Sequence, residues 1–116
     1  MTHLHPTGDE LVEMLAALSN PLRLRIIATL AGGRDYVSHL AREIGVSRPL
    51  VHMHLQRLEA VGLITGSLEL SEDGKAMKYY DVTDFALQLT PKTLAEAAQT
   101  LTTTDTEKGP SRKERS

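Results

Sequence analysis

The sequence predicts a mainly α-helical fold with one small β-hairpin. Apolar residues recur at helical spacing over several segments between residues 9 and 101, and a single pair of short segments favours strands. The chain has 116 residues, which suits one compact domain. Because it contains only three Tyr and one Phe, its core is expected to be aliphatic, and so small a chain gains from sharing its core with a second copy.

Two helices are predicted at the start of this domain, over residues 9–18 and 22–30. Acids stand in the first turn of the earlier helix, where the helix dipole favours them. Pro21 is placed to begin the second helix, and a glycine pair at 32–33 is placed to end it. The apolar faces carry Leu11, Met14, Leu15 and Leu18 in the first helix and Leu22, Ile26, Ile27 and Leu30 in the second.

The segment over residues 47–61 is the most informative part of the chain. Ser47 is a good N-cap, Pro49 falls in the first turn, where a missing N–H costs nothing, and Gly62 suits the position after the C-cap. A shorter helix over residues 37–44, closed by a glycine, comes just before it. Two helices joined by a short glycine-containing turn are typical of a helix-turn-helix, in which the second helix reads the major groove of DNA.

This 47–61 helix has two different faces. Val51, Leu55 and Leu58 recur at positions i, i+4 and i+7 and form a narrow apolar stripe. The other face is rich in side chains that can donate hydrogen bonds or make apolar contacts with bases. The residues on it that are expected to contact DNA are Arg48, Pro49, His52, Met53, Gln56 and Arg57.

Arg48 is the strongest candidate for reading a base. It stands one residue after the N-cap, where recognition helices first meet base edges, and its planar guanidinium fits O6 and N7 of guanine. A solvated arginine or a phosphate contact is the alternative. Pro49 and Met53 suit apolar contact with thymine methyl groups. Arg42 and Arg57 are assigned to phosphates or to ion pairs with nearby glutamates.

A β-hairpin is predicted after these helices, with strands over residues 63–70 and 77–83 and a turn at 71–74. Such a hairpin forms a wing beside the helix-turn-helix. Lys75 and Lys78 in this wing are expected to reach an adjacent minor groove or the DNA backbone. Three acids of the wing oppose that role: Glu69, Glu72 and Asp73.

A Thr-Pro pair at 90–91 predicts a last helix that ends near Leu101. Its small apolar face has no obvious partner within the domain. Two helices, a helix-turn-helix, a two-stranded wing and this last helix together describe a winged helix-turn-helix over residues 9–101. Residues 1–8 are predicted to be a flexible arm, and residues 102–116 a disordered tail.

Charge and composition narrow the range of functions. The net charge is −2, but residues 34–62 carry four arginines and three acids, a local +1, so modest DNA affinity and a shallow salt dependence are expected. The absence of cysteine excludes disulfides, thiolate metal sites and cysteine nucleophiles, and no phosphate loop or catalytic spacing favours an enzyme. No apolar run approaches the roughly 20 residues that span a bilayer, so a cytoplasmic protein without a membrane partner is expected.

Four segments of the chain, in this order, resemble the ArsR/SmtB family of small dimeric winged helix-turn-helix transcription regulators. They are L-S-N-P-L-R-L-R-I-I-A-T-L at 18–30, L-A-R-E-I-G-V-S at 40–47, V-H-M-H-L-Q-R-L-E-A-V-G-L-I at 51–64 and Y-Y-D-V at 79–82. The resemblance implies a homodimer that binds a double-stranded DNA operator. Within this family, an alternative is a closer resemblance to a nickel-linked member, such as a regulator of a nickel-containing superoxide dismutase.

The apolar face of the last helix, together with the 9–18 helix, is assigned to the homodimer interface, as in the resembled family. Two recognition helices would then enter major grooves of half-sites about 10 base pairs apart, or a multiple of that. The alternative is a winged-helix protein–protein adaptor or a partner subunit of a regulatory complex, which the acidic wing favours. The residues expected at the dimer interface are Leu11, Leu15, Leu94, Ala97, Ala98 and Leu101.

Many members of this family sense metals, but the ligands of their sites are not kept here. The resemblance places the family's thiolate site on Tyr36 and Ser38, and neither of these is a thiolate. Its interface site falls on Asp84, Ala86, Ala97 and Thr100. Only the aspartate among these four is a metal-ligand type. His52 and His54 stand about 200° apart around a helix and cannot bind one ion together.

The weak metal candidates are His3 and His5 on the arm, with His39 assisting across the dimer. Imidazoles of this kind suit nickel or zinc. The arm must lose its conformational freedom to bind an ion, which weakens such a site. No cofactor and no tight metal site are therefore expected, and sensing is expected to be delegated to a separate sensor protein.

Overall fold

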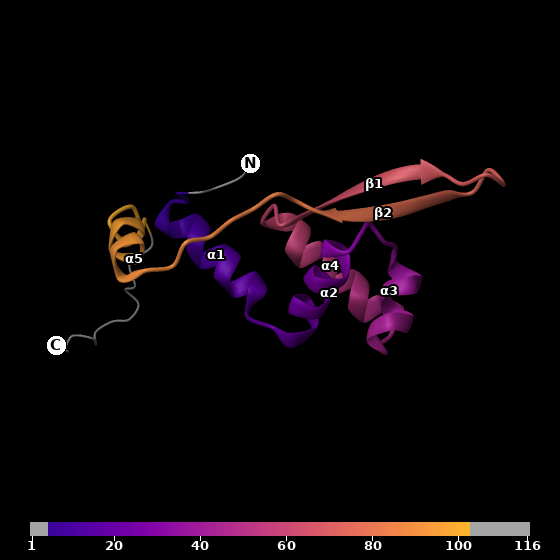
Figure 1. The fold of residues 1–116 in the computed structure, drawn as a ribbon, viewed down its shortest axis with the longest axis horizontal. Coiled ribbons are helices and arrows are strands. Elements are labelled where there is room, and N and C mark those ends of the chain that lie inside the picture. Colours follow the sequence, from indigo (N-terminus) through magenta and orange to yellow (C-terminus); the bar gives the residue numbers. More distant parts are fainter. Residues whose placement is uncertain (1–4, 103–116) are drawn as a thin grey trace.

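The computed structural model describes residues 5–102, which form five helices and a two-stranded antiparallel sheet (Figure 1). The prediction of a mainly α-helical fold with one hairpin is confirmed. Residues 1–4 and 103–116, most of the predicted arm and tail, lie outside the described residues. Gly8, which was assigned to the arm, is instead the first residue of α1. The elements are α1 (Gly8–Leu18), α2 (Pro21–Ala31), α3 (Val37–Ile44), α4 (Arg48–Ala60), β1 (Ile64–Leu70), β2 (Ala76–Val82) and α5 (Pro91–Ala98).

Side-chain caps start four of the five described helices. The predicted caps Ser47 and Thr90 both accept a backbone N–H three residues ahead, from Leu50 and Thr93. α1 begins with a capping box between Thr7 and Glu10, which was not predicted from the sequence. α5 ends three residues before the predicted position, because its final carbonyls are taken up by tight i→i+3 hydrogen bonds such as Thr100 N to Ala97 O at 3.0 Å.

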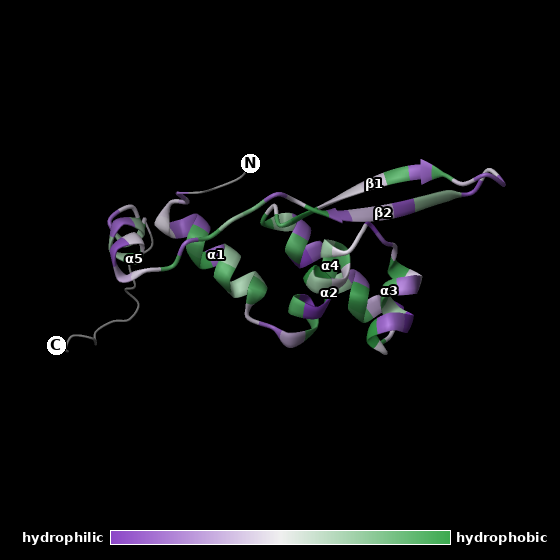
Figure 2. Ribbon diagram, viewed as in Figure 1, coloured by the Kyte–Doolittle hydropathy of each residue, from purple (hydrophilic) through white to green (hydrophobic). Residues whose placement is uncertain are grey.

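The core lies between α1, α2, α3, α4 and the start of the wing. The predicted stripe of Val51, Leu55 and Leu58 is fully buried, at 0% exposure. Figure 2 shows that these four helices carry hydrophobic and hydrophilic residues side by side, so each has one face for the core. The expectation of a purely aliphatic core is wrong in one position. Tyr80 is buried beside Gly66, where an added Cβ would lie only 3.1 Å from the tyrosine ring.

The wing is tied to the helices by the loop that precedes α3. Asp35 exchanges two backbone hydrogen bonds with Tyr80, of 3.1 and 2.8 Å, so this loop acts as a short third strand beside β2. Arg34 lies 4.3 Å from the ring centre of Tyr79 and forms an ion pair with Glu69 on β1. These contacts hold the base of the wing against the helix-turn-helix, and they neutralise one of the acids that opposed a role in DNA binding.

α5 packs against α1, away from the helix-turn-helix (Figure 1). The Gly8 N–H donates a hydrogen bond of 2.7 Å to the Thr100 hydroxyl, and Leu11 and Ala97 are each only 8% exposed. The expectation that the last helix has no partner within the domain is therefore wrong. The prediction failed because of Gly8. In the sequence this glycine favours a helix break, but in the structure its lack of a side chain lets the backbones of α1 and α5 approach closely.

Candidate nucleic-acid interface

The helix-turn-helix is built from α3 and α4. Gly45 ends α3 in the left-handed conformation, with φ of 84°, and its N–H donates to the Ala41 carbonyl at 2.8 Å. Ser47 then caps α4, and Pro49 lies in its first turn. Gly62, with φ of 80°, turns the chain from the end of α4 into β1. These glycine, serine and proline residues set the geometry of the turn. The predicted bounds of both helices agree with the structure to within one residue.

α4 has one face in the core and one in solvent. The buried positions are Val51, His54, Leu55 and Leu58. All six residues that were predicted to contact DNA from this helix are exposed: Arg48, Pro49, His52, Met53, Gln56 and Arg57. His52 and His54 lie on different faces, as their spacing requires, so they do not share a ligand site.

Arg48 and Arg42 come together at the N-terminal end of α4. Both line one open hollow between α3 and α4, along with Ser38 and Ser47. Two guanidinium groups beside a helix N-terminus make this the most favourable place on the motif for an anionic backbone or an acceptor-rich base edge. Neither arginine forms an ion pair with another of the described residues.

The two predicted glutamate partners are engaged elsewhere. Glu43 lies 3.7 Å from the Nε2 atom of His39, and Glu59 lies 3.9 Å from the Nζ atom of Lys78. The alternative in which Arg42 and Arg57 pair with these glutamates is therefore wrong. His39 and the wing residue Lys78 lie beside these carboxylates instead, and Arg57 is exposed on the outer face of α4.

The two wing lysines lie in different surroundings. Lys78 lies between Glu59 and the ring of Tyr80, whose centre is 5.3 Å from Nζ, so its charge is partly engaged within the protein. Lys75 is exposed at the turn between β1 and β2. Asp73 shares this turn, and its pKa is lowered mainly by a hydrogen bond from the Ser71 hydroxyl. Lys75 is the better placed of the two for a contact with DNA.

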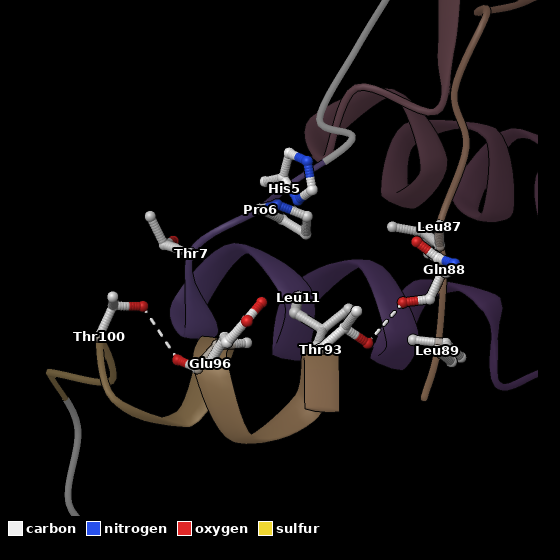
Figure 3. Close-up of a pocket in the computed structure, with 11 residues that line it drawn as sticks. His5, Pro6, Thr7, Leu11, Leu87, Gln88, Leu89, Thr93, Glu96 and Thr100 are labelled. Atoms are coloured by element: carbon white, nitrogen blue, oxygen red, sulfur yellow. Dashed lines mark hydrogen bonds between the residues drawn. The ribbon is translucent and has the colours of Figure 1, made fainter. Parts of the chain in front are cut away.

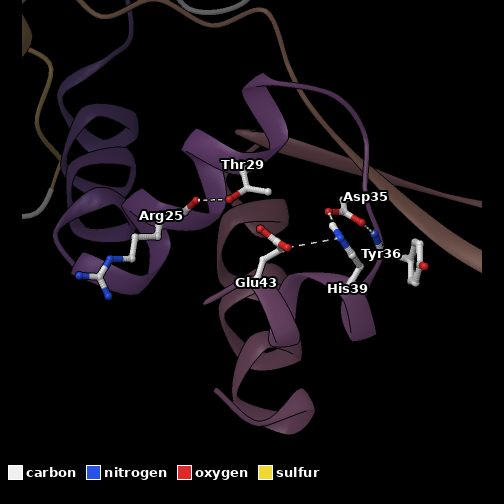
Figure 4. Close-up of polar contacts among 6 residues, drawn as sticks. All are labelled: Arg25, Thr29, Asp35, Tyr36, His39 and Glu43. Atoms are coloured by element: carbon white, nitrogen blue, oxygen red, sulfur yellow. Dashed lines mark hydrogen bonds and ion pairs between the residues drawn. The ribbon is translucent and has the colours of Figure 1, made fainter. Parts of the chain in front are cut away.

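Figure 4 shows the carboxylates around His39, the proposed helper in metal binding. Its Nδ1 lies 2.6 Å from the Asp35 carboxylate, while Nε2 faces Glu43. The other oxygen of Asp35 accepts the N–H of Tyr36, at the position of the family's thiolate site. Both ring nitrogens of His39 are thus directed to carboxylates of its own chain. Within residues 5–102 no group of three or more His, Cys, Asp or Glu residues is arranged to hold a metal ion.

A pocket of about 230 Å³ opens between the start of α1, α5 and the segment before α5 (Figure 3). His5, the described member of the predicted arm pair, lines it, together with Leu11 and Ala97. His3 lies outside the described residues. Two of the positions on which the family's interface metal site falls are Asp84 and Thr100. Asp84 is exposed, and the Thr100 hydroxyl donates a hydrogen bond of 2.9 Å to the Ala97 carbonyl at the end of α5.

No helix among residues 5–102 is long and apolar enough to cross a membrane. Residues 18–66 match a helix-turn-helix domain family, HTH_20. This match spans α2, the helix-turn-helix and the first residues of β1.

The chain is similar to several transcription regulators. It is 37% identical over 76 residues to the uncharacterized HTH-type transcriptional regulator MJ0229 of Methanocaldococcus jannaschii, covering 66% of this chain and 79% of the relative. It is 38% identical over 58 residues to the HTH-type transcriptional repressor SmtB of Mycobacterium tuberculosis, covering 50% of this chain but only 43% of the repressor.

Solved structures show the same fold. A homodimeric winged helix-turn-helix DNA-binding domain from Mycobacterium bovis, a possible ArsR-family regulator, is 28% identical, with a TM-score of 0.57 and 64% of each chain covered. The transcriptional repressor BigR of Xylella fastidiosa is 23% identical and supports the fold alone, with a TM-score of 0.56 over 78% of this chain and 79% of that one. This chain therefore belongs to the ArsR/SmtB family of winged helix-turn-helix DNA-binding transcription regulators.

Proposed function

We propose that the chain regulates transcription as a homodimer that places the two copies of α4 in successive major grooves of an operator. The observation that carries this proposal is the outer face of α4, on which all six candidate side chains are exposed while the opposite face is buried. A surface helix that follows a glycine turn and bears arginine and glutamine outward has the geometry of a recognition helix.

Each candidate residue has a proposed role on the DNA. Arg48 reads a guanine, and Pro49 and Met53 contact thymine methyl groups. Arg42 and Arg57 contact phosphates on either side of the groove and fix the position of the helix. His52 and Gln56 lie between these residues on the same face, and Lys75 at the wing tip contacts the neighbouring backbone.

The dimer is proposed to form through α1 and α5. The homodimeric domain from M. bovis supports a dimer, and the apolar surface that the fold leaves open on α5 supports this choice of interface. Leu94 and Leu101 remain 44% and 41% exposed, and Ala98 is exposed beside them, whereas Leu15 is half-buried. Leu11 and Ala97 are already buried within one copy, so they support the interface from beneath.

Footprinting on DNA from the chain's own promoter region tests the proposal. A protected pseudo-palindrome is expected, with an affinity that falls as salt rises. The adaptor function would be favoured instead by two results together. The chain would show no preference among DNA sequences, and it would bind a protein partner with an affinity that does not change with salt. Transcription assays on the same DNA fragment then show whether binding represses or activates the promoter.

Replacing Arg48 by alanine is expected to weaken binding to the operator by about 1–3 kcal/mol, with a smaller loss on random DNA, because a bidentate contact to guanine is lost. Fluorescence anisotropy on both DNAs at one salt concentration measures the difference. Arg25→Ala is the matched control, since Arg25 is exposed on α2 and points away from α3 (Figure 4). Equal losses of affinity on operator and random DNA would reduce Arg48 to a phosphate contact.

Nickel, zinc or cobalt is expected to bind only weakly and to leave operator affinity nearly unchanged. Tight sensing sites need three or four converging ligands, and Asp84 is the one ligand type kept at the interface site. Titration calorimetry on the metal-free protein, followed by anisotropy with each metal, tests this. A stoichiometric submicromolar site would contradict it, and a His3→Ala, His5→Ala variant would show whether the arm supplies it. In the proposed scheme, sensing belongs to a separate protein.

A further inference from the structure

A buried arginine and a buried histidine meet behind the proposed recognition helix. Arg23 of α2 and His54 of α4 are only 8% and 4% exposed. The Nε atom of Arg23 donates to the Ala17 carbonyl of α1 at 2.6 Å, and an Nη1 atom lies 2.9 Å from Nδ1 of His54. One guanidinium group therefore connects three helices, and its hydrogen bond to His54 is a polar contact on the otherwise apolar buried face of α4.

The arginine decides which form of the histidine fits this contact. A guanidinium is protonated at every physiological pH and can only donate hydrogen bonds. The Nδ1 atom of His54 must therefore accept, which requires a neutral imidazole with its proton on Nε2. A second proton on Nδ1 would remove the acceptor and set two cations against each other in a buried place.

The charged surroundings of His54 all disfavour that second proton. Burial lowers the pKa of His54, and the charges of Arg23 on α2 and Arg57 on α4 lower it further. The group that α1 contributes is the Ala17 carbonyl, which is already bonded to Arg23. α3 and β1 pack on this core with apolar side chains such as Leu40 and Ile64. No carboxylate among the described residues raises the pKa of His54.

We propose that the Arg23–His54 contact is a proton-sensitive positioning device for DNA binding. While His54 is neutral, Arg23 holds α4 at the angle at which its outer face meets the groove. When His54 takes up a proton, the contact breaks, α4 loosens and operator affinity falls in mildly acidic medium. This inference rests on the proposed function, in which α4 is the element that reads DNA, and His54 acts on DNA only through the position of that helix.

The sign of the expected pH dependence follows from the environment of His54. His54 has a lowered pKa in the folded state, so its contribution to stability is present above the ordinary value of 6.5 and is lost as the pH falls. His52 is exposed on the outer face of α4, the face proposed to meet DNA. The test of His54 is therefore made in a background in which His52 is replaced, so that only His54 can report on the inner face of the helix.

The test compares His52→Gln with the double variant His52→Gln, His54→Asn. The asparagine oxygen stands near the place of Nδ1, so it can accept from Arg23 but cannot be protonated. Operator affinity is measured by anisotropy at constant ionic strength at about pH 7.5 and about pH 5.0. The single variant is expected to lose about fivefold in affinity over this range and the double variant about twofold or less. Equal pH profiles, or an affinity of the single variant that rises as the pH falls, would overturn the proposal.

A second measurement on the wild-type chain needs no DNA and no variant. Nitrogen-15 NMR is expected to show His54 as the neutral Nε2–H form near neutral pH, with a pKa below the ordinary histidine value of 6.5. Corrected amide hydrogen exchange is expected to speed up in α4 on acidification while amides of the remaining core stay protected. An Nδ1–H form, unchanged protection of α4 or a simultaneous loss of protection throughout the core would overturn the proposal. A chain that gives these NMR results but binds no DNA would instead overturn the proposed function.

Discussion

Replacing Gly8 by alanine is expected to lower the free energy of unfolding by about 1–3 kcal/mol, the usual range for overpacking. An added Cβ at this position would lie 2.3 Å from the Ala97 carbonyl oxygen and 2.8 Å from the side chain of Leu101. A backbone carbonyl cannot turn aside as a flexible side chain can, so α5 must move away from α1. Urea unfolding, followed by circular dichroism, measures the loss of stability.

Gly32→Ala is the matched control for this prediction. Gly32 caps α2 with an ordinary negative φ of −84°, and an added Cβ would meet only the Thr29 carbonyl, at 3.5 Å. Its stability is expected to change by no more than about 0.5 kcal/mol. If Gly8→Ala were as stable as this control, the close contact between α1 and α5 would not contribute to the fold.

The parts of the fold that were predicted correctly are those specified by neighbouring residues. Ser47 and Pro49 mark the start of α4 and Gly62 follows its end, and the stripe from Val51 to Leu58 repeats at the helical period. The same holds for the Thr-Pro start of α5. Because the two faces of a helix follow from its own periodicity, the exposed face of α4 could also be assigned from the sequence.

The contacts that the sequence did not reveal join residues far apart in the chain. Arg34 and Glu69 looked like unrelated surface charges, yet they form the ion pair that holds the wing. Arg23 is one of two arginines on α2, and nothing in the sequence pairs it with His54, which the fold places beside it. Spacing along the chain carries no information on such pairs, and a single sequence gives no covariation from which to infer them.

The double replacement of Leu94 and Leu101 by glutamate is expected to give a folded monomer with about 10²–10⁴-fold weaker operator binding. In one copy of the chain these two side chains are 44% and 41% exposed, so the glutamates can remain in solvent and the domain is expected to fold. In the proposed dimer the same glutamates would be buried without partners, which is too costly for the interface to form. A monomer engages one half-site, so it loses the gain from binding two half-sites at once.

Sedimentation measures the oligomeric state of this variant, and anisotropy measures its operator affinity. Leu24→Glu is the matched control, because Leu24 is 54% exposed on α2, outside the proposed interface, and this variant is expected to remain dimeric. A double variant that stays dimeric would place the interface elsewhere on the molecule. A monomeric variant that binds the operator as tightly as the wild type would show instead that one copy of α4 suffices, and that the apolar face of α5 serves a purpose other than DNA binding.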